Sequence, residues 1–321
     1  MNMESNITVI PGAEQGLSIS GIQSQTFESN PALLYLMSLG SKKSRQSMMS
    51  LLNIVAKMLG QHDIKNCQWQ HIRRAHVQAI VAQLKESGRA PSTVNTYLAA
   101  MKGVSMEAWT LGLMTTDNYQ HIKHIKGSKG HRIPKGRALS GREITALFDA
   151  CSRDTSAKGV RDAAILGVLL GCGLRRSELV SLSMENMNMH NQSISVLGKG
   201  DKERVAFVPD KSWDRLMNWI ETVRGEYEGP IFTRIRRFDD VTLDGMSDQA
   251  VYHILIERQK DADIASFAPH DLRRTFASAL LETEDIITVR DAMGHSDVTT
   301  TSRYDRRSDD RLKKASQKLN F

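Results

Sequence analysis

The sequence predicts a mainly α (α+β) protein, with an N-terminal helical domain and a C-terminal, mostly helical domain that contains a small antiparallel sheet. Three observations lead to this fold class. Apolar residues recur at helical spacing along most of the chain, two strand-like runs (193–197 and 204–208) flank a glycine-containing turn, and a basic stretch interrupted by glycines lies between the two domains. The 321 residues are enough for about two domains.

The composition is mildly basic, with 43 Lys and Arg against 36 Asp and Glu, a net charge of +7 and a pI near 9.3. This charge is compatible with nucleic-acid binding but does not establish it. Cys67, Cys151 and Cys172 show no paired or metal-ligand spacing, so neither a disulfide framework nor a zinc site is predicted. No apolar run approaches the roughly 20 residues of a membrane helix. No secretory signal is visible either, so we expect a soluble cytoplasmic protein.

The first domain is predicted to be a helical bundle over residues 29–126, preceded by a flexible arm at 1–28. The arm mixes Gly, Ser, Gln and Asn without a sustained period. Three apolar faces with i, i+3, i+4 spacing follow it, and each predicts a helix that packs inward. Their residues are Met48, Leu51, Leu52, Val55, Met58 and Leu59; then Val77, Ile80, Val81 and Leu84; and, after Pro91, Val94, Leu98, Met101 and Ala108.

The polar faces of these helices carry cations that are candidates for contacts to DNA phosphates. Each of them, taken singly, is more simply explained as an ordinary solvated surface charge. The candidates are Lys42, Lys43, Arg45, Arg73, Arg74 and Lys102.

A basic segment, 120–137, is predicted to be a linker rather than a folded element, with residues 127–137 joining the two domains. It holds six cations and no acid, and three glycines and one proline interrupt it. Cations in such a linker would release counterions from DNA and add affinity without sequence information. The alternative is a solvated tether. The candidates for DNA contact here are Lys123, Lys126, Lys129, Arg132 and Lys135.

The second domain is predicted to span residues 138–307. Ser140 and Glu143 fit a capping box that starts its first helix. The nearly all-apolar run 163–170 predicts a central buried helix, and the two strand-like runs predict a hairpin around residues 198–203. Two further amphipathic helices are predicted from Trp213, Leu216, Ile220 and Val223 and from Val251, Ile254, Leu255 and Arg258.

Separate stretches of this domain carry residues suited to chemistry on a phosphate group. Arg175 follows an apolar run, and Lys199 lies in the glycine-rich turn of the hairpin. His270 and Arg273 are three residues apart near the start of a predicted helix, and therefore lie on one face of it.

The last such stretch runs from His295 to Tyr304. His295 precedes Asp297, which is predicted to cap a short helix by accepting hydrogen bonds from its first amides. Tyr304 follows that cap by seven residues, about two turns later and on the same side. The spacing would hold a phenol near an imidazole.

In order, these residues are Arg, Lys, His-x-x-Arg, Gly-His and Tyr, and this order resembles the tyrosine recombinase family, which comprises the phage integrases and the Xer-type recombinases. The 24 residues from Arg175 to Lys199 and the nine from His295 to Tyr304 are similar to the family's spacing. The resemblance covers residues 137–307 and extends more weakly back to about residue 30. Each residue alone has an ordinary explanation, but all six in one order form a specific pattern.

The resemblance implies that DNA is cleaved without loss of the phosphoryl bond energy, which is kept in a covalent link to the protein. Tyr304 would attack the scissile phosphate, leaving a 3′-phosphotyrosine and a free 5′-hydroxyl. Arg175 and Arg273 would neutralise the transition state, and His295 would donate a hydrogen bond to the same oxygens. No metal or other cofactor is implied, and no Gly-Lys-Ser/Thr loop for ATP is present in the sequence.

The same resemblance assigns proton transfer and orientation. His270 would assist proton movement at the hydroxyl of Tyr304, and Lys199 would protonate the departing 5′-oxygen as general acid. Glu178, one turn beyond Arg175, would orient the groups that contact the phosphate.

The implied function is site-specific recombination of double-stranded DNA by a homo-tetramer, through two rounds of cleavage and ligation and a four-way junction. The residues name neither the DNA site nor accessory proteins or a partner recombinase, and they do not distinguish integration, excision or resolution of a mobile element or replicon. Two alternatives stay open: a type IB topoisomerase and a catalytically silent DNA-binding regulator.

The tail, 308–321, places Leu312, Ala315 and Leu319 at helical spacing and is predicted to dock on a neighbouring protomer, or else on its own domain.

Overall fold

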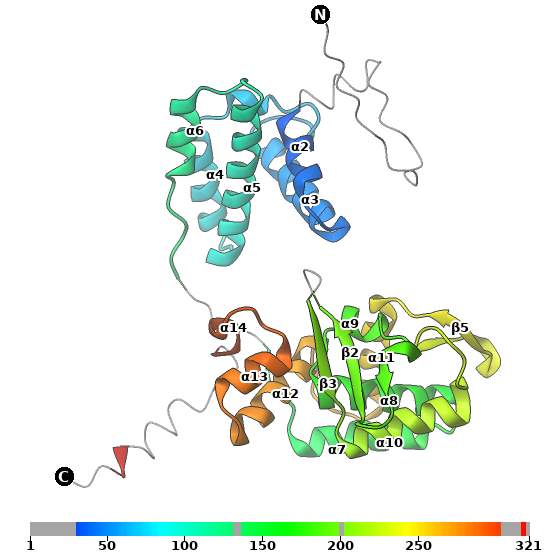
Figure 1. The fold of residues 1–321 in the computed structure, drawn as a ribbon. Helices are drawn as coiled ribbons and strands as arrows, with labels where there is room; N and C mark the ends of the chain where they lie inside the picture. Colours follow the sequence, from blue (N-terminus) through cyan, green and yellow to red (C-terminus); the bar gives the residue numbers. More distant parts are fainter. Residues whose placement is uncertain (1–29, 131–135, 199–201, 303–315, 319–321) are drawn as a thin grey trace, which may run out of the picture. The chain divides into compact units, whose positions relative to one another are not determined.

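The computed structural model describes residues 30–130, 136–198, 202–302 and 316–318. The chain divides between Ile133 and Pro134 into two compact units (Figure 1). The predicted arm lies outside the described residues, as do most of the predicted tail, Arg132, Lys135, Lys199 and Tyr304. No helix in the described ranges is long and apolar enough to cross a membrane.

In its described part, the N-terminal unit is built from helices. They are α2 (Pro31–Ser38), α3 (Lys42–Met58), a 3-10 turn (Trp69–His71), α4 (Arg74–Glu86), α5 (Pro91–Thr110) and α6 (Thr116–Lys123). The three predicted apolar faces lie on α3, α4 and α5, which confirms those helices. Asn30 caps α2 and Ser41 caps α3, because each side chain accepts hydrogen bonds from first-turn amides.

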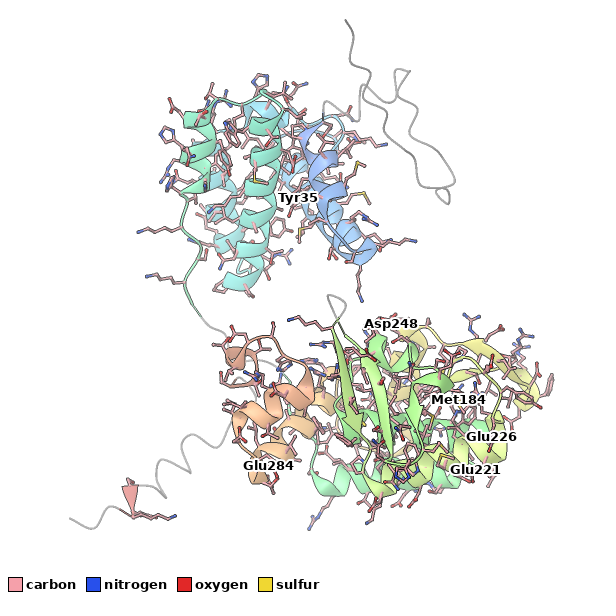
Figure 2. All side chains as sticks on the ribbon, in the orientation of Figure 1. Tyr35, Met184, Glu221, Glu226, Asp248 and Glu284 are labelled. Atoms are coloured by element: carbon pink, nitrogen blue, oxygen red, sulfur yellow. The ribbon has the colours of Figure 1, made fainter. Side chains whose placement is uncertain are left out.

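Helices α2 and α5 approach closely because a glycine faces a tyrosine. Tyr35 lies on α2 beside α5 (Figure 2). A Cβ atom at Gly103 of α5 would lie 2.3 Å from the Tyr35 ring, so a larger residue would force the ring or the helices to shift. Fully buried apolar side chains, among them Leu52, Val77 and Met101, fill the core around this contact.

The prediction of a linker from residue 120 onward is wrong for its first part, because residues 120–123 form the end of α6. Thr115 caps this helix, and Tyr119 and Ile122 bury their side chains in the core that α5 also lines. Two apolar residues three apart give too weak a period to stand out within a basic stretch.

The C-terminal unit is mostly helical and contains antiparallel strands, which confirms the predicted fold class. Its helices are α7 (Gly141–Arg153), α8 (Ala157–Cys172), α9 (Arg176–Val180), α10 (Asp210–Trp219) with a π-helical turn (Ile220–Arg224), α11 (Asp248–Asp261), α12 (Pro269–Thr283), α13 (Ile286–Met293) and α14 (Val298–Ser302). Its strands are β1 (Met187–Asn188), β2 (Ser193–Leu197), β3 (Glu203–Phe207), β4 (Thr233–Ile235) and β5 (Val241–Gly245), and 3-10 turns lie at Met184–Asn186 and Arg237–Asp239.

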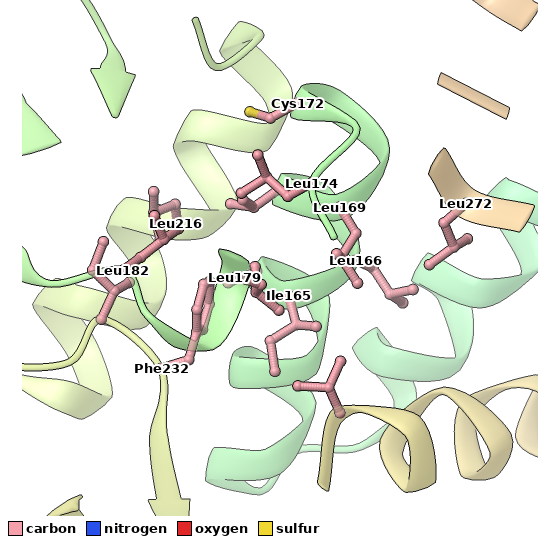
Figure 3. Packing of buried hydrophobic residues seen from close by; sticks show 14 of the residues in the cluster. Ile165, Leu166, Leu169, Cys172, Leu174, Leu179, Leu182, Leu216, Phe232 and Leu272 are labelled. Carbon is pink, nitrogen blue, oxygen red and sulfur yellow. The ribbon is translucent and has the colours of Figure 1, made fainter. Parts of the chain in front are cut away.

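The predicted central helix is α8, and it forms the middle of the main core. Ile165 and Leu166 of α8 are completely buried. Figure 3 shows them packed with Leu179 of α9, Leu216 of α10 and Phe232. Helix α8 therefore fixes where the short helix α9, which follows it directly, begins.

The predicted hairpin is present as β2 and β3, in a register that pairs Leu197 with Glu203. Strand β1 pairs with the other edge of β2. The prediction of one sheet is wrong, since β4 and β5 form a second sheet. Strand β4 is short, the pairing has a register shift, and the turn places Phe238 and Asp239 at positive φ where glycine is usual. Neither alternation nor turn chemistry therefore marks this hairpin in the sequence.

The last helices of the unit share a small core of their own. Ala277 and Leu281 of α12 pack with Val289 and Met293 of α13, and all four side chains are completely buried. This cluster is separate from the main core, to which Leu272 at the start of α12 belongs. Helix α12 therefore connects the main core to a much smaller one.

A buried network of charges joins α8 to α11. Asp162 of α8 accepts hydrogen bonds from its neighbour Arg161 at 3.0 and 2.9 Å and from Nε of Arg258 on α11 at 2.8 Å. Arg258 also forms an ion pair with Asp154, which precedes α8. Buried charges need such partners, because removing one partner of a buried pair costs about 3–5 kcal/mol.

We expect Arg258→Met to lower the free energy of unfolding of the C-terminal unit by about 3 kcal/mol, because Asp162 stays buried and loses one of its two cations. Denaturant titration followed by circular dichroism measures this change. Lys260→Met, at an exposed position of the same helix, is the matched control and should change stability by less than about 0.5 kcal/mol. Equal losses in the two variants would contradict the assignment of Arg258 to a buried network.

Candidate active site

An open cleft of about 570 Å³ in the C-terminal unit is lined by two of the predicted catalytic residues, Arg175 and His295. It lies where the start of α9, the turn between β2 and β3, and the connection from α13 to α14 meet. The lining residues are Arg175, Gly198, Lys202, Glu203, Arg204, Asp291, Gly294, His295, Ser296 and Thr300.

Glu178 lies beneath this cleft and contacts three arginines. Its side chain is only 4% exposed. Oε1 accepts a hydrogen bond from Nη1 of Arg175, and Oε2 accepts one from the Arg175 backbone amide at 3.0 Å and one from Nη2 of Arg204 at 2.8 Å. Nη1 of Arg273 lies 4.0 Å from Oε2. Burial by itself would raise the pKa of the Glu178 carboxyl, but the hydrogen bonds from Arg204 and Arg175 outweigh it and hold that pKa below its ordinary value.

The two predicted arginines differ in exposure. The Arg175 side chain is 35% exposed and lines the cleft, whereas the Arg273 side chain is 1% exposed. Arg273 donates hydrogen bonds to the carbonyls of Gly173 and Met293, at the C-terminal ends of α8 and α13. These helix-end carbonyls lack partners within their helices and carry partial negative charge, so a cation is stabilised between them. Arg273 is therefore held rigidly, while Arg175 keeps access to the cleft.

His295 is held between Arg273 and α14. Its Nε2 lies 3.0 Å from Nη2 of Arg273, and its Nδ1 lies 2.9 Å from the hydroxyl of Thr301. Because a guanidinium group only donates, Nε2 accepts this hydrogen bond and Nδ1 carries the ring proton. Burial, and then the positive charges of Arg273 and Arg175, lower the pKa of His295 to about 4, so the ring is neutral at pH 7. Donation of a hydrogen bond from Nε2 to a phosphate would require His295 to gain a proton or to separate from Arg273.

His270 is the second residue of α12 and is exposed. Partial desolvation, and then the positive charges of Arg273 and Arg274, lower the pKa of His270. A neutral imidazole beside cations suits a group that accepts a proton.

Two of the predicted catalytic residues, Lys199 and Tyr304, lie outside the described residues, but the elements beside them are described. The amide of Gly198 donates a hydrogen bond to the carbonyl of Lys202 at 2.7 Å across the turn that contains Lys199. The predicted cap is confirmed, because Asp297 accepts a hydrogen bond from the amide of Thr299 at 2.9 Å at the start of α14. Helix α14 ends at Ser302, two residues before Tyr304 in the sequence.

Arg204 is a residue of this cleft that the sequence reasoning missed. No signal in the sequence marked it, because alternation of apolar residues would turn Val205 and Phe207 inward. In the structure these two side chains are exposed, and Arg204 pairs in register with the buried Val196 of β2. Alternation therefore turns Arg204 toward the interior, where an arginine needs a partner.

Several predicted DNA-binding cations of the N-terminal unit donate hydrogen bonds to backbone carbonyls. Arg45 bonds Leu39, Arg73 bonds Gln70 and Ile72, Arg74 bonds His121, and Lys102 bonds Ile125. These hydrogen bonds stabilise helix ends and loops. Lys42 and Lys43 lie exposed at the start of α3.

One hollow of the N-terminal unit, of about 460 Å³, brings predicted cations together. Arg74 and Lys85 of α4 line it with His124 and Lys126, which follow α6. Lys85 was not predicted. Lys123 packs over the ring of Tyr119, and Lys126 and Lys129 are exposed. Close to Lys129, Asn95 of α5 bonds both backbone groups of Ser128, at 2.7 and 3.1 Å.

No group of three or more His, Cys, Asp or Glu side chains that could hold a metal ion occurs in the described part of the chain. The cleft instead brings together the guanidinium groups of Arg175 and Arg204 and the neutral imidazole of His295, with Lys202, Glu203 and Asp291 at its wall. Such a set of groups stabilises negative charge on oxygen atoms and is suited to a phosphate diester.

Known proteins resemble this chain over most of its length. Tyrosine recombinase XerD of Listeria monocytogenes serovar 1/2a is 31% identical over 236 residues, which cover 73% of this chain and 77% of the relative. Tyrosine recombinase XerC of Alcanivorax borkumensis is 27% identical over 243 residues, covering 74% and 76%. Among solved structures, a lambda integrase tetramer bound to a Holliday junction has a TM-score of 0.64 at 14% identity, covering 87% of this chain and 76% of that one. The Tn1549 transposon integrase in complex with circular intermediate DNA has a TM-score of 0.63 at 16% identity, covering 90% and 99%.

Family models match both units of the chain. The phage integrase family matches residues 137–311, and the N-terminal SAM-like domain of phage integrases matches residues 34–110. The chain belongs to the phage integrase family of tyrosine recombinases. It is a site-specific DNA recombinase.

Lowering the pH should destabilise the C-terminal unit through His295. The pKa of this residue is about 4 in the folded protein against an ordinary 6.5, so between these values the unfolded chain binds a proton that the folded chain does not. We expect the Tm to fall as the pH is lowered from 6.5 toward 4, and to fall less in His295→Gln. His190→Gln, exposed between β1 and β2, is the matched control and should follow the wild type. Parallel curves for wild type and His295→Gln would contradict this interpretation.

Proposed function

We propose that the protein cleaves and rejoins double-stranded DNA at a specific recombination site through a 3′-phosphotyrosine at Tyr304. The observation that carries this proposal is the pair Arg175 and Arg273, which come from different parts of the chain and lie against one carboxylate beside His295. Two guanidinium groups and an imidazole at one cleft fit the charge of an in-line phosphoryl transfer.

The arginines would act on the non-bridging oxygens of the scissile phosphate. Planar guanidinium groups bind two oxygens at once, which a lysine cannot do. Arg273 would supply a fixed charge, because the carbonyls of Gly173 and Met293 hold it, and Arg175 would reach the phosphate from the cleft wall. His295 would add a hydrogen bond to the same oxygens once Nε2 carries a proton.

Proton transfer would use His270 and Lys199. His270, whose pKa is lowered, would take the proton of the Tyr304 hydroxyl as the oxygen attacks phosphorus. Lys199 would give a proton to the departing 5′-oxygen, and reversal of the two steps would rejoin the strand. Energy stored in the phosphotyrosine would make strand exchange independent of ATP.

Recombination of two sites requires several protomers, and we propose a homo-tetramer that exchanges strands in two rounds through a four-way junction. The lambda integrase structures are described as a dimer on a core site and a tetramer on a Holliday junction, which supports this assembly.

In the N-terminal unit, the cations around Arg74 and Lys126 would bind phosphates of the duplex. Integration, excision and resolution all use this chemistry. A type IB topoisomerase would share the cleavage step but leave two sites unexchanged.

Tyr304→Phe removes the nucleophile and leaves the DNA-binding surfaces intact. We expect it to bind its target as the wild type does and to form no covalent adduct on a nicked suicide duplex. A duplex recovered by selection from a random pool would serve as substrate, and a denaturing gel would detect the adduct. Tyr252→Phe, on α11, is the matched control and should form the adduct at the wild-type rate. Wild-type adduct with Tyr304→Phe would place the nucleophile elsewhere.

Lys199→Ala should lose the general acid. A substrate with sulfur at the 5′-bridging position tests this role, because a thiolate leaves without a proton. We expect the variant to cleave ordinary DNA about 10²-fold or more slowly and the sulfur substrate nearly as fast as the wild type. Lys202→Ala is the control and should show no such difference. An equal defect of Lys199→Ala on both substrates would exclude it as the acid.

A further inference from the structure

Arg204 occupies the base of the cleft without having a role in the mechanism so far. It lies on β3, and its side chain is 11% exposed. Nη2 donates to Oε2 of Glu178 at 2.8 Å, while the buried Nε has no hydrogen-bond partner among the described residues. The side chain lines the cleft together with Arg175 and His295.

Space for Arg204 is provided by a glycine next to His295. Gly294 ends α13 in the left-handed region, at φ +62°, where a side chain is strained. A Cβ atom at Gly294 would also lie 3.1 Å from both Cδ and Nη1 of Arg204. The glycine of the Gly-His pair therefore serves two purposes: it turns the chain after α13, and it leaves room for this guanidinium group.

The charges around Glu178 show what Arg204 can do there. A carboxylate that is 4% exposed must keep a cationic partner, because a buried unpaired charge is costly. Arg175 is one partner, but it is also the residue that would have to bind the phosphate. Without Arg204, moving the Arg175 guanidinium group to the phosphate would leave Glu178 with no hydrogen-bonded cation and only Arg273, 4.0 Å away, beside it.

We propose that Arg204 is a positioning residue that neutralises Glu178, so that the charge of Arg175 is available to the scissile phosphate. Three guanidinium groups lie against one carboxylate, which leaves two positive charges in excess. Arg204 keeps its ion pair with Glu178 throughout, and Arg175 exchanges Glu178 for phosphate oxygens. This inference rests on the proposed role of Arg175 in phosphate binding.

The test compares Arg204→Gln, which removes the charge, with Arg204→Lys, which keeps it. We expect Arg204→Gln to bind a single DNA site within about 2-fold of the wild type but to form the covalent adduct at least about 10-fold more slowly. Arg204→Lys should retain most of the rate. A wild-type rate for Arg204→Gln would overturn the proposal.

A second change separates charge balance from a merely structural role. Adding Glu178→Gln to Arg204→Gln removes the charge that Arg204 neutralises, so the double variant should form the adduct at least about 10-fold faster than Arg204→Gln alone. A double variant no faster than the single one would overturn the proposal. Should Arg204→Gln fail to fold, the double variant replaces it, and a folded double variant without activity would overturn the proposal.

A substrate with an uncharged scissile phosphate separates a charge defect from a folding defect, because a folding defect would slow the cleavage of both substrates. A substrate whose scissile phosphate carries a methyl group in place of a non-bridging oxygen has lost its negative charge. Arg204→Gln should cleave this substrate as fast as the wild type does, and a persistent defect would count against the proposal.

Failure of the proposed function is distinguishable, because the wild type would then form no adduct at all. The Arg204 proposal is in that case decided by titrating inorganic phosphate into the protein. Arg204→Gln should weaken phosphate binding, and the added Glu178→Gln should restore it. Equal affinities of wild type and Arg204→Gln would overturn the proposal.

Discussion

Glu178 is a buried carboxylate surrounded by guanidinium groups, and the arrangement of the cleft depends on balancing its charge. Each of its oxygens accepts a hydrogen bond from a guanidinium group, one from Arg175 and one from Arg204, and Arg273 lies beside them. The three arginines come from the start of α9, from β3 and from α12, so a single carboxylate fixes the relative positions of three elements. Cations would repel one another in this space without it.

Arg273 shows how the rest of the fold contributes. It is buried between the C-terminal ends of α8 and α13, and both helices are followed by a glycine in the left-handed region, Gly173 and Gly294. These glycines end the helices abruptly and leave their last carbonyls directed at the guanidinium group. The position of His295 follows from the same geometry, since it comes directly after Gly294 and contacts Arg273.

Much of the fold could be predicted from the sequence, because its signals are local. The apolar faces of α3, α4 and α5, the capping box at Ser140 and the glycine-rich hairpin all depend on residues close in the chain. The second sheet and α6 were not predicted, because β4 and α6 are short and held by contacts with the rest of their unit. The order of Arg175, His270, Arg273 and His295 along the sequence, which resembles the family pattern, indicated these residues as candidates for the site.

What sequence could not supply was the partner of each side chain. Arg204 and Glu178 are 26 residues apart, and nothing local pairs them. The carbonyl that Lys102 binds belongs to Ile125, which lies in the segment predicted to be a linker. Such pairings arise only when the elements have packed, so they are properties of the folded unit and not of any segment.

The separate small core of α12 and α13 has a consequence for cooperativity. Only Ala277, Leu281, Val289 and Met293 make up its fully buried centre, so opening it exposes far less apolar surface than opening the core around α8. Regions with few buried contacts open at a lower free energy than the whole protein, and amide exchange reports them as separate units. The described segment from α13 to α14, including His295, is attached to this weaker unit. Helices α13 and α14 can thus open as a piece while Arg175 and Arg204 stay with the larger core, whereas Arg273, which donates to the carbonyl of Met293, would lose a partner.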